Sequence, residues 1–563
     1  MYAKTAKAER IPSTGGKARI YPNGYVYWIT KSEWDKTLKR TVDDRVCIGK
    51  KVEEKDGWLY PNERFFRLFN ESIELIADGT GKLASRGKFS TVLNFGVFEA
   101  LLQAASKCGC LEALKTSHPN DYEKILAVAI HSIDAQNSVA QEFPDWAFHN
   151  YNGLKRIFGD GEISTLYTNI AEDSCAIETF LDNFRKNFKQ KFNRERLGIL
   201  GFDSTNQNTA SKNISLAEFG HAKINENLPD INTAMFVDED TGIPLFYEHF
   251  YGSLLDKSET PTTLEKVKEL GFEHLFLMMD RGYLSKECLK ALETEKFGVM
   301  CPDGLTFTKE LINKNKDIIK DNENYYIEEE DIYGIYLPKT EYDGKIYDAY
   351  VFYDEPRSHD ERRSIHHRIE FFKKSLLKKK RFPKKLSEMF APWIEVKELS
   401  EKDANGRNFS IKENRKEIQK YIDESGFFVI LSNAGLSADQ MIRVARMRDK
   451  SEKAFRRLKY HFGLTKTYVH NQSTYEGKMF VAFVALIIVE AFRYFVRSIL
   501  RATSSETTAT VISELRKYQI KAKNNGQWMP MYCMTASQKK IFTSLELTAA
   551  QVETDVRKLT LRV

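Results

Sequence analysis

The chain is poor in the residues that mark disulfide-rich, collagen-like and membrane-spanning proteins. Its 563 residues include 7 cysteines, 14 prolines and 30 glycines. The cysteines form no CxxC pair and have no ladder of histidine partners, so we expect reduced thiols in a cytoplasmic protein. The strongest apolar run, at 480–489, ends at Glu490, short of the ~20 residues that a membrane span needs. We therefore expect a core helix there and no membrane partner.

A large excess of charge of one sign is also missing. The chain has 85 Lys and Arg against 79 Asp and Glu, which leaves a net charge of +6. A nucleic-acid partner must therefore be argued from local basic patches. The hydrophobic content of 42% and the charged content of 29% are typical of a soluble globular protein. The length is too great for one hydrophobic core and predicts several domains.

One segment combines charged and apolar residues at helical spacing. On an α-helix, Arg448, Glu452 and Lys459 fall within about 40° of one another. An adjoining apolar stripe is formed by Val444, Met447, Phe455 and Leu458. Ser437 and Gln440 fit a capping box at the helix start, and we expect the helix to run to about residue 460. A solvated helix with ordinary ion pairs would show the same pattern, so the helix alone does not decide the function.

Two apolar segments end in an aspartate. Residues 197–203 and 275–280 each predict a buried strand with an acid, Asp203 or Asp280, at its C-terminal end and a turn after it. A single such Asp is usually a turn former or a helix cap. Ligands of open α/β sheets bind outside the carboxyl ends of the strands, so two such acids can share one metal site.

Together these segments resemble the DDE transposases of bacterial insertion sequences, in the group with a Tyr-x2-Arg-x3-Glu-x6-Lys signature. Arg448, Glu452 and Lys459 match that spacing, whereas Ala445 stands where the signature has Tyr. In the family this Tyr helps to hold a terminal phosphate. With Ala445 at this position, the chain lacks the tyrosine that makes the contact. Residues 280–283 resemble the second-acid motif, and segments within 219–256 and 426–431 resemble other parts of the family's core.

The resemblance implies an enzyme that cuts and rejoins DNA through two Mg²⁺ ions, for which Mn²⁺ can substitute. Asp203, Asp280 and Glu452 would be the catalytic and metal-binding residues, since Mg²⁺ prefers hard oxygen ligands. Arg448 and Lys459 would neutralise phosphate charge, and Lys223 is a further DNA contact. The implied partners are double-stranded DNA, the terminal inverted repeats of its own element and a second copy of the chain on paired DNA ends. The implied route is cut-and-paste through a hairpin intermediate, in the bacterial cytoplasm at the nucleoid.

The expected fold is α/β, with a ribonuclease-H-like catalytic core interrupted by a β-rich insertion and with helical N- and C-terminal regions. We expect the following segments: a small β segment at 1–60, a helical DNA-end-binding domain at 61–195, the first part of the core at 196–302, the insertion at 303–425, the second part of the core with the Glu helix at 426–480, and a helical region at 481–563 with a candidate role in dimerisation.

The insertion carries the densest basic segment. Eleven Lys and Arg and one acid lie between Arg362 and Lys385, with apolar residues on one side of the predicted helix. The two interpretations are a solvated helix face and a surface that follows the DNA backbone through cations such as Lys378, Lys379 and Lys380. Trp393 is a candidate for stacking on a flipped base, with a structural role as the alternative.

Two other functions are compatible with these residues. One is a DDE-type endonuclease that cuts DNA without strand transfer, and the other is a non-catalytic DNA-binding protein derived from a transposase. The complete set of Asp203, Asp280 and Glu452 argues against the second. A strand-transfer assay would separate a transposase from a nuclease.

Overall fold

The computed structural model describes residues 8–11, 17–35, 39–69, 92–194, 199–220, 225, 227–254, 262–263, 265, 276–379, 388, 393–403, 406–447, 449–502, 507–522 and 527–559. The chain divides into two compact units. Unit 1 comprises residues 1–104, 120–166 and 495–563, and unit 2 comprises residues 105–119 and 167–494.

Unit 1 begins with a five-stranded antiparallel sheet, in the order β1-β5-β4-β3-β2. Its strands are β1 (Glu9–Arg10), β2 (Ala18–Ile20), β3 (Tyr25–Asp35), β4 (Arg40–Lys51) and β5 (Trp58–Pro61). The first five residues of β3 are aromatic or apolar, and Val26 and Trp28, which lie on one face of the strand, are buried. Val26, Ile48 and Leu59 are fully buried there and pack with Phe65 of α1 (Glu63–Phe69).

The rest of unit 1 joins helices to a three-stranded sheet of β20 (Trp528–Pro530), β19 (Gln519–Ala522) and β6 (Val92–Asn94). Asp134 accepts hydrogen bonds from Trp146 at 2.7 Å and from Arg516 at 2.6 Å, which ties three helices together. The helices are α5 (Tyr122–Ala135), α6 (Phe143–His149), α18 (Arg497–Ala502), α19 (Thr508–Arg516), α20 (Ala536–Ser544) and α21 (Ala549–Lys558), while α3 (Gly96–Lys107) and α7 (Asp160–Glu172) contain residues of both units.

Unit 2 is built on one mixed sheet in the order β12-β13-β14-β17-β11-β10-β7-β8-β9, with β18 also paired to β7. β10 runs parallel to both β7 and β11, and β7, β8 and β9 form an antiparallel meander. The strands are β7 (Ile199–Thr209), β8 (Asp230–Asp238), β9 (Pro244–Tyr251), β10 (Phe276–Met279), β11 (Lys296–Met300), β12 (Tyr326–Ile327), β13 (Ile332–Tyr342), β14 (Lys345–Tyr353), β17 (Phe427–Ser432) and β18 (Lys466–Thr467).

Helices pack against this sheet. α16 contacts β7 and β8, and α11 contacts β13, β14 and β17. The helices are α4 (Cys110–Ser117), α8 (Ser174–Lys191), α10 (Lys286–Ala291), α11 (Thr306–Ile319), α12 (Glu355–Leu377), α14 (Arg415–Glu424), α15 (Ala438–Met447), α16 (Asp449–Arg456) and α17 (Gln472–Phe495). α17 is buried along most of its length, which confirms the predicted core helix at 480–489. No described helix is long and apolar enough to cross a membrane.

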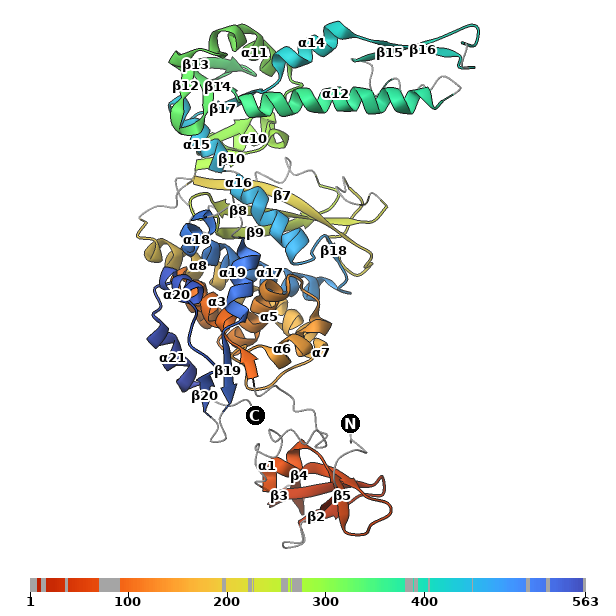
Figure 1. Ribbon diagram of the computed structural model, residues 1–563, viewed down its shortest axis with the longest axis vertical. Coiled ribbons are helices and arrows are strands. Elements are labelled where there is room, and N and C mark those ends of the chain that lie inside the picture. The colour runs from red at the N-terminus through yellow and green to blue at the C-terminus, as the bar shows by residue number, and fades with distance from the viewer. Residues whose placement is uncertain are drawn as a thin grey trace. The chain divides into compact units, whose positions relative to one another are not determined.

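α12 lies beside the hairpin of β15 (Ile394–Glu398) and β16 (Phe409–Glu413) and beside α14 (Figure 1). Its buried residues recur at helical spacing and pack on the hairpin and on Ile418 of α14. They are Ile365, Ile369, Phe372 and Leu376. This leaves the charged side of α12 in solvent.

The strands before α12 belong to the main sheet and do not form a separate insertion. The expected β-rich insertion contains β12, β13 and β14, but residues 348–353 of β14 pair with β17, so these strands extend the main sheet. The reason is that β17 is buried throughout, so it needs a strand on each side to satisfy its backbone. The elements of this region outside the main sheet include α12, the β15–β16 hairpin and α14.

Candidate active site

Asp203 and Asp280 lie on neighbouring parallel strands. In the pairing of β10 with β7, Phe276 is opposite Ile199 and Met278 is opposite Gly201. Continued by two residues, the same register places Asp280 opposite Asp203. Residues in register on adjacent strands point to the same face of a sheet, so the two half-buried acids are neighbours on one face.

β10 ends at Met279, and Asp280 caps the 3-10 turn η2 (Arg281–Tyr283) by accepting the Arg281 N–H at 2.7 Å. This confirms the predicted strand end with an acid and a turn. The corresponding prediction for Asp203 is wrong, because β7 continues to Thr209 and Asp203 lies in mid-strand.

Buried polar side chains extend β7 past Asp203. Gln207 donates to the carbonyl of Leu464 at 2.6 Å, and Asn208 donates to the carbonyls of Asn225 and Leu228. The backbone of β7 also pairs with β8 as far as Asn208. The polar residues after Asp203 would indicate a turn if their side chains were in solvent. In the structure they donate hydrogen bonds to buried carbonyls of neighbouring segments, so the strand continues.

Glu452 lies on α16, which packs against β7 and β8. Its side chain is 54% exposed and accepts a hydrogen bond from Arg456 at 3.1 Å. Of the predicted apolar stripe, Val444, Phe455 and Leu458 are buried, and the side chain of Met447 lies outside the described residues. Ser437 N–H donates to Gln440 at 3.1 Å, which confirms one half of the predicted capping box, while the Ser437 hydroxyl bonds Asp439.

The continuous α-helix predicted to residue 460 is wrong beyond α16. Arg457–His461 form a π-helical turn, η5, and Gly463 follows with a φ of 67°. π-Turns often occur at functional sites. Lys459 lies in this turn and is only 8% exposed. Arg457, in the same turn, is held at 2.5 Å by Glu490 of α17, and burial lowers its pKa, with smaller contributions from Arg493 and Arg456 and against the opposing effect of Glu490.

In the described parts of the chain, no three His, Cys, Asp or Glu residues are grouped to hold a metal ion. Asp203 and Asp280 are brought together by strand register, and Glu452 is not gathered with them into such a group. The two aligned carboxylates offer hard oxygen donors of the kind that Mg²⁺ prefers, so this edge of the sheet fits a divalent ion in its donor chemistry.

The proposed DNA contacts are distributed over unit 2. Lys378 and Lys379 follow α12 and are exposed. Lys380, Lys223 and Arg448 lie outside the described residues. Trp393 is half-buried, with its ring 5.6 Å from that of Tyr421 and the Arg368 guanidinium 5.4 Å above it. Its carbonyl accepts the Asn414 N–H at 2.9 Å.

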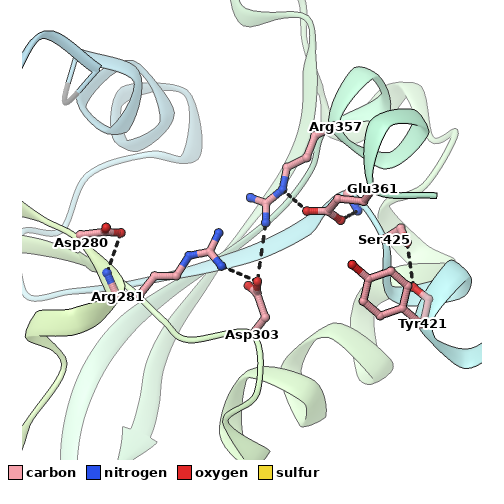
Figure 2. Close-up of polar contacts among 8 residues, drawn as sticks. Asp280, Arg281, Asp303, Arg357, Glu361, Tyr421 and Ser425 are labelled. Atoms are coloured by element: carbon pink, nitrogen blue, oxygen red, sulfur yellow. Dashed lines mark hydrogen bonds and ion pairs between the residues drawn. The ribbon is translucent and has the colours of Figure 1, made fainter. Parts of the chain in front are cut away.

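A chain of ion pairs next to Asp280 is absent from the sequence-based predictions. Figure 2 shows Arg281 bonded to Asp303, Arg357 near the same carboxylate, and Arg357 bonded to Glu361. Asp303 follows β11, the parallel neighbour of β10. The turn sequence Pro302-Asp303-Gly304 after an apolar strand was the available signal, since it places another acid at the same sheet edge.

Comparisons with known proteins relate the chain to transposases. A family model described as "Transposase DDE domain" matches residues 196–488. A piggyBac transposase synaptic complex with hairpin DNA is similar at 7% identity and a TM-score of 0.34, over 82% of this chain and 84% of that one. A Mos1 transposase paired-end complex with a left transposon end has 11% identity and a TM-score of 0.14, over 32% and 59% of the two chains. No curated protein matches the chain.

Proposed function

The chain belongs to the transposase DDE domain family, and we propose that it is a transposase that cuts and rejoins DNA at the ends of its own element by phosphoryl transfer. The observation that carries this proposal is the alignment of Asp203 with Asp280 on adjacent parallel strands. Two carboxylates on one face of a sheet are suited to share a cation and to be approached by a phosphodiester from outside the sheet.

We interpret strands β9, β8, β7, β10 and β11 as a ribonuclease-H-like core. Three antiparallel strands are followed in the sheet by two parallel ones, with Asp203 on the first strand in the chain and Asp280 after the fourth. α16, the helix that carries Glu452, packs on β7. The topology supports the assignment of Asp203, Asp280 and Glu452 as the catalytic acids.

Mg²⁺ ions held by these carboxylates, or Mn²⁺ in their place, would activate a water or 3′-hydroxyl nucleophile and stabilise the leaving oxygen. Asp203 and Asp280 are placed to bind from the strands. To bind the same ions, Glu452 must break its hydrogen bond with Arg456 and adopt another rotamer. Its side chain is 54% exposed, which permits this change. Arg448 and Lys459 are proposed to balance phosphate charge on this side, and Lys223 to contact DNA near Asp203.

The insertion is proposed to bind DNA through the exposed end of α12, at Lys378 and Lys379 and the following Lys380. Trp393 is proposed as a stacking residue, although its contacts with Tyr421 and Arg368 also suit a structural role. The domain limits given above, a homodimer on paired ends and a hairpin route belong to the same proposal, as do terminal inverted repeats as the substrate.

The proposal is tested with purified full-length chain, Mg²⁺ and labelled duplexes made from the DNA that flanks the gene. A transposase should nick the element end and join the freed 3′-hydroxyl to other DNA, or to the opposite strand as a hairpin. Nicks without any joined product would instead indicate a nuclease. Binding without nicks, in Mg²⁺ and in Mn²⁺, would indicate a non-catalytic DNA-binding protein.

A further inference from the structure

Asp303 lies between two arginines that come from different parts of unit 2. Its Oδ2 atom forms an ion pair with Arg281 and lies 3.8 Å from Nη2 of Arg357 (Figure 2). Arg281 directly follows the candidate acid Asp280, and Arg357 belongs to the first turn of α12. One carboxylate therefore connects the second-acid motif to the helix that carries the basic surface of the insertion.

The Arg357 side of this connection is firmly held. Arg357 Nε donates to Glu361 at 2.7 Å, and the other Glu361 oxygen accepts the Gly426 N–H at 2.8 Å. The guanidinium also lies 5.1 Å from the ring centre of Phe428, on β17. Gly426 has a φ of 85°, and a Cβ there would lie 2.5 Å from Cβ of Ser358 on α12, so glycine is needed for the close approach of β17 to α12. Arg357 is thus fixed to the sheet.

The Arg281 side is open to solvent. Its side chain is 37% exposed, and that of Asp303 is 49% exposed. A guanidinium has five N–H donors in a planar fork, and the ion pair with Asp303 occupies only part of them. The remaining donors suit the oxygens of a phosphate. The Arg281 backbone N–H bonds the Asp280 carboxylate at 2.7 Å, so the Arg281 side chain begins beside that acid and extends to Asp303 (Figure 2).

We propose that Asp303 is a positioning residue for DNA cleavage, which holds Arg281 so that its guanidinium contacts a DNA phosphate beside Asp280. Arg357 keeps Asp303 in place from the other side. Asp303 itself touches no substrate in this scheme, and it acts by restricting the rotamers of Arg281 before DNA binds. The inference rests on the proposed function and names the DNA phosphate as the partner of Arg281.

The experiment uses the full-length chain and end duplexes in which single phosphates around the nick are replaced, one at a time, by neutral methylphosphonates. In the wild type, neutralisation of the contacted phosphate should lower the rate of nicking. Asp303→Asn and Arg281→Gln should each lower kcat/KM at least about tenfold, since a small misplacement of a positioned group can cost up to about a hundredfold. Both variants should also lose sensitivity to that one methylphosphonate, because Arg281 is absent in one variant and no longer positioned in the other.

Three further measurements give the test its controls. Asp303→Glu keeps the charge and should restore part of the rate. Glu293→Gln removes an exposed ion pair with Lys345 in the same unit and should leave nicking and phosphate sensitivity unchanged. The melting temperature of each variant separates misfolding from a loss of positioning. If Asp303→Asn does not fold, Arg281→Gln, which alters a partly exposed side chain, still tests whether Arg281 contacts the DNA phosphate.

The outcomes separate this inference from the proposed function. Asp303→Asn that nicks at the wild-type rate, or that keeps the full methylphosphonate effect, overturns the positioning role and leaves the transposase proposal standing. A lower melting temperature with an unchanged phosphate response identifies a purely structural ion pair and also overturns it. A wild-type chain that cuts no DNA overturns both.

Discussion

Asp203 in the middle of β7 and Asp280, the residue directly after β10, occupy matching positions when the register of these parallel strands is continued two residues beyond the pair Gly201 and Met278. β10 stops at this level while β7 continues, so the sheet has a step where the two acids lie.

We expect the three acids to be required for cleavage and not for DNA binding. Asp203→Asn, Asp280→Asn and Glu452→Gln remove proposed metal ligands and leave the basic surface intact, so nicking should fall below about one thousandth of the wild-type rate. DNA affinity, measured by fluorescence anisotropy in Ca²⁺, should change little. Asp343→Asn, which removes the exposed partner of Lys286, is the matched control. Wild-type nicking by Glu452→Gln would contradict the assignment of the third acid.

The basic segment after α12 should bind the DNA backbone without reading sequence. Replacing Lys378, Lys379 and Lys380 with Ala should reduce the slope of log affinity against log salt by up to about 3, roughly one unit per phosphate contact. The loss should be equal for element ends and unrelated DNA, because phosphates carry no sequence information.

The control for the basic segment is a triple replacement of exposed lysines in unit 1, at Lys521, Lys539 and Lys540. It should leave the salt slope unchanged. An unchanged slope in the α12 triple variant would show that this segment is only a solvated helix end, and a loss confined to element ends would point to base reading.

Two neighbouring arginines should contribute very differently to stability. Arg457 pairs with Glu490 at 2.5 Å with side chains 14% and 7% exposed, whereas Arg456 pairs with Glu452 with side chains 62% and 54% exposed. Glu490→Ala leaves a buried cation without its carboxylate, which should cost about 3 kcal/mol or more of unfolding free energy. Glu452→Ala should cost less than about 1 kcal/mol. Urea unfolding of both variants gives the comparison, and equal losses would contradict it.

Glu99 should make unit 1 less stable as the pH rises. Burial, with a smaller effect of Asp555, raises the pKa of Glu99 from 4.5 to about 7. Between these values the folded chain binds more protons than the unfolded chain, so stability falls as pH rises from about 4.5 through 7. Glu99→Gln removes this term and should raise the melting temperature relative to the wild type at pH 8, with a much smaller difference at pH 5. Glu178→Gln, at an exposed position, should show no such pH dependence.

Local pattern was sufficient for much of the candidate site. The apolar run before Asp280 predicted a strand that ends at an acid, and β10 ends directly before Asp280. The spacing of Val444, Phe455 and Leu458 predicted the buried face of the Glu helix. These features depend on hydrophobic periodicity and turn chemistry within a few residues, and both are legible in a single sequence.

Tertiary structure alone decided the remaining features. β7 runs past Asp203 because Gln207 and Asn208 find carbonyl partners in segments that are distant in sequence. β14 joins the main sheet because β17 offers it a buried edge, and Asp303 pairs with Arg281 and Arg357 only because β10, β11 and α12 meet. In each case a polar group is satisfied by a partner far along the chain, and which partner it finds depends on the assembled sheet. The sequence by itself therefore determined which residues are candidates for the chemistry, and the tertiary structure decided which of them become neighbours.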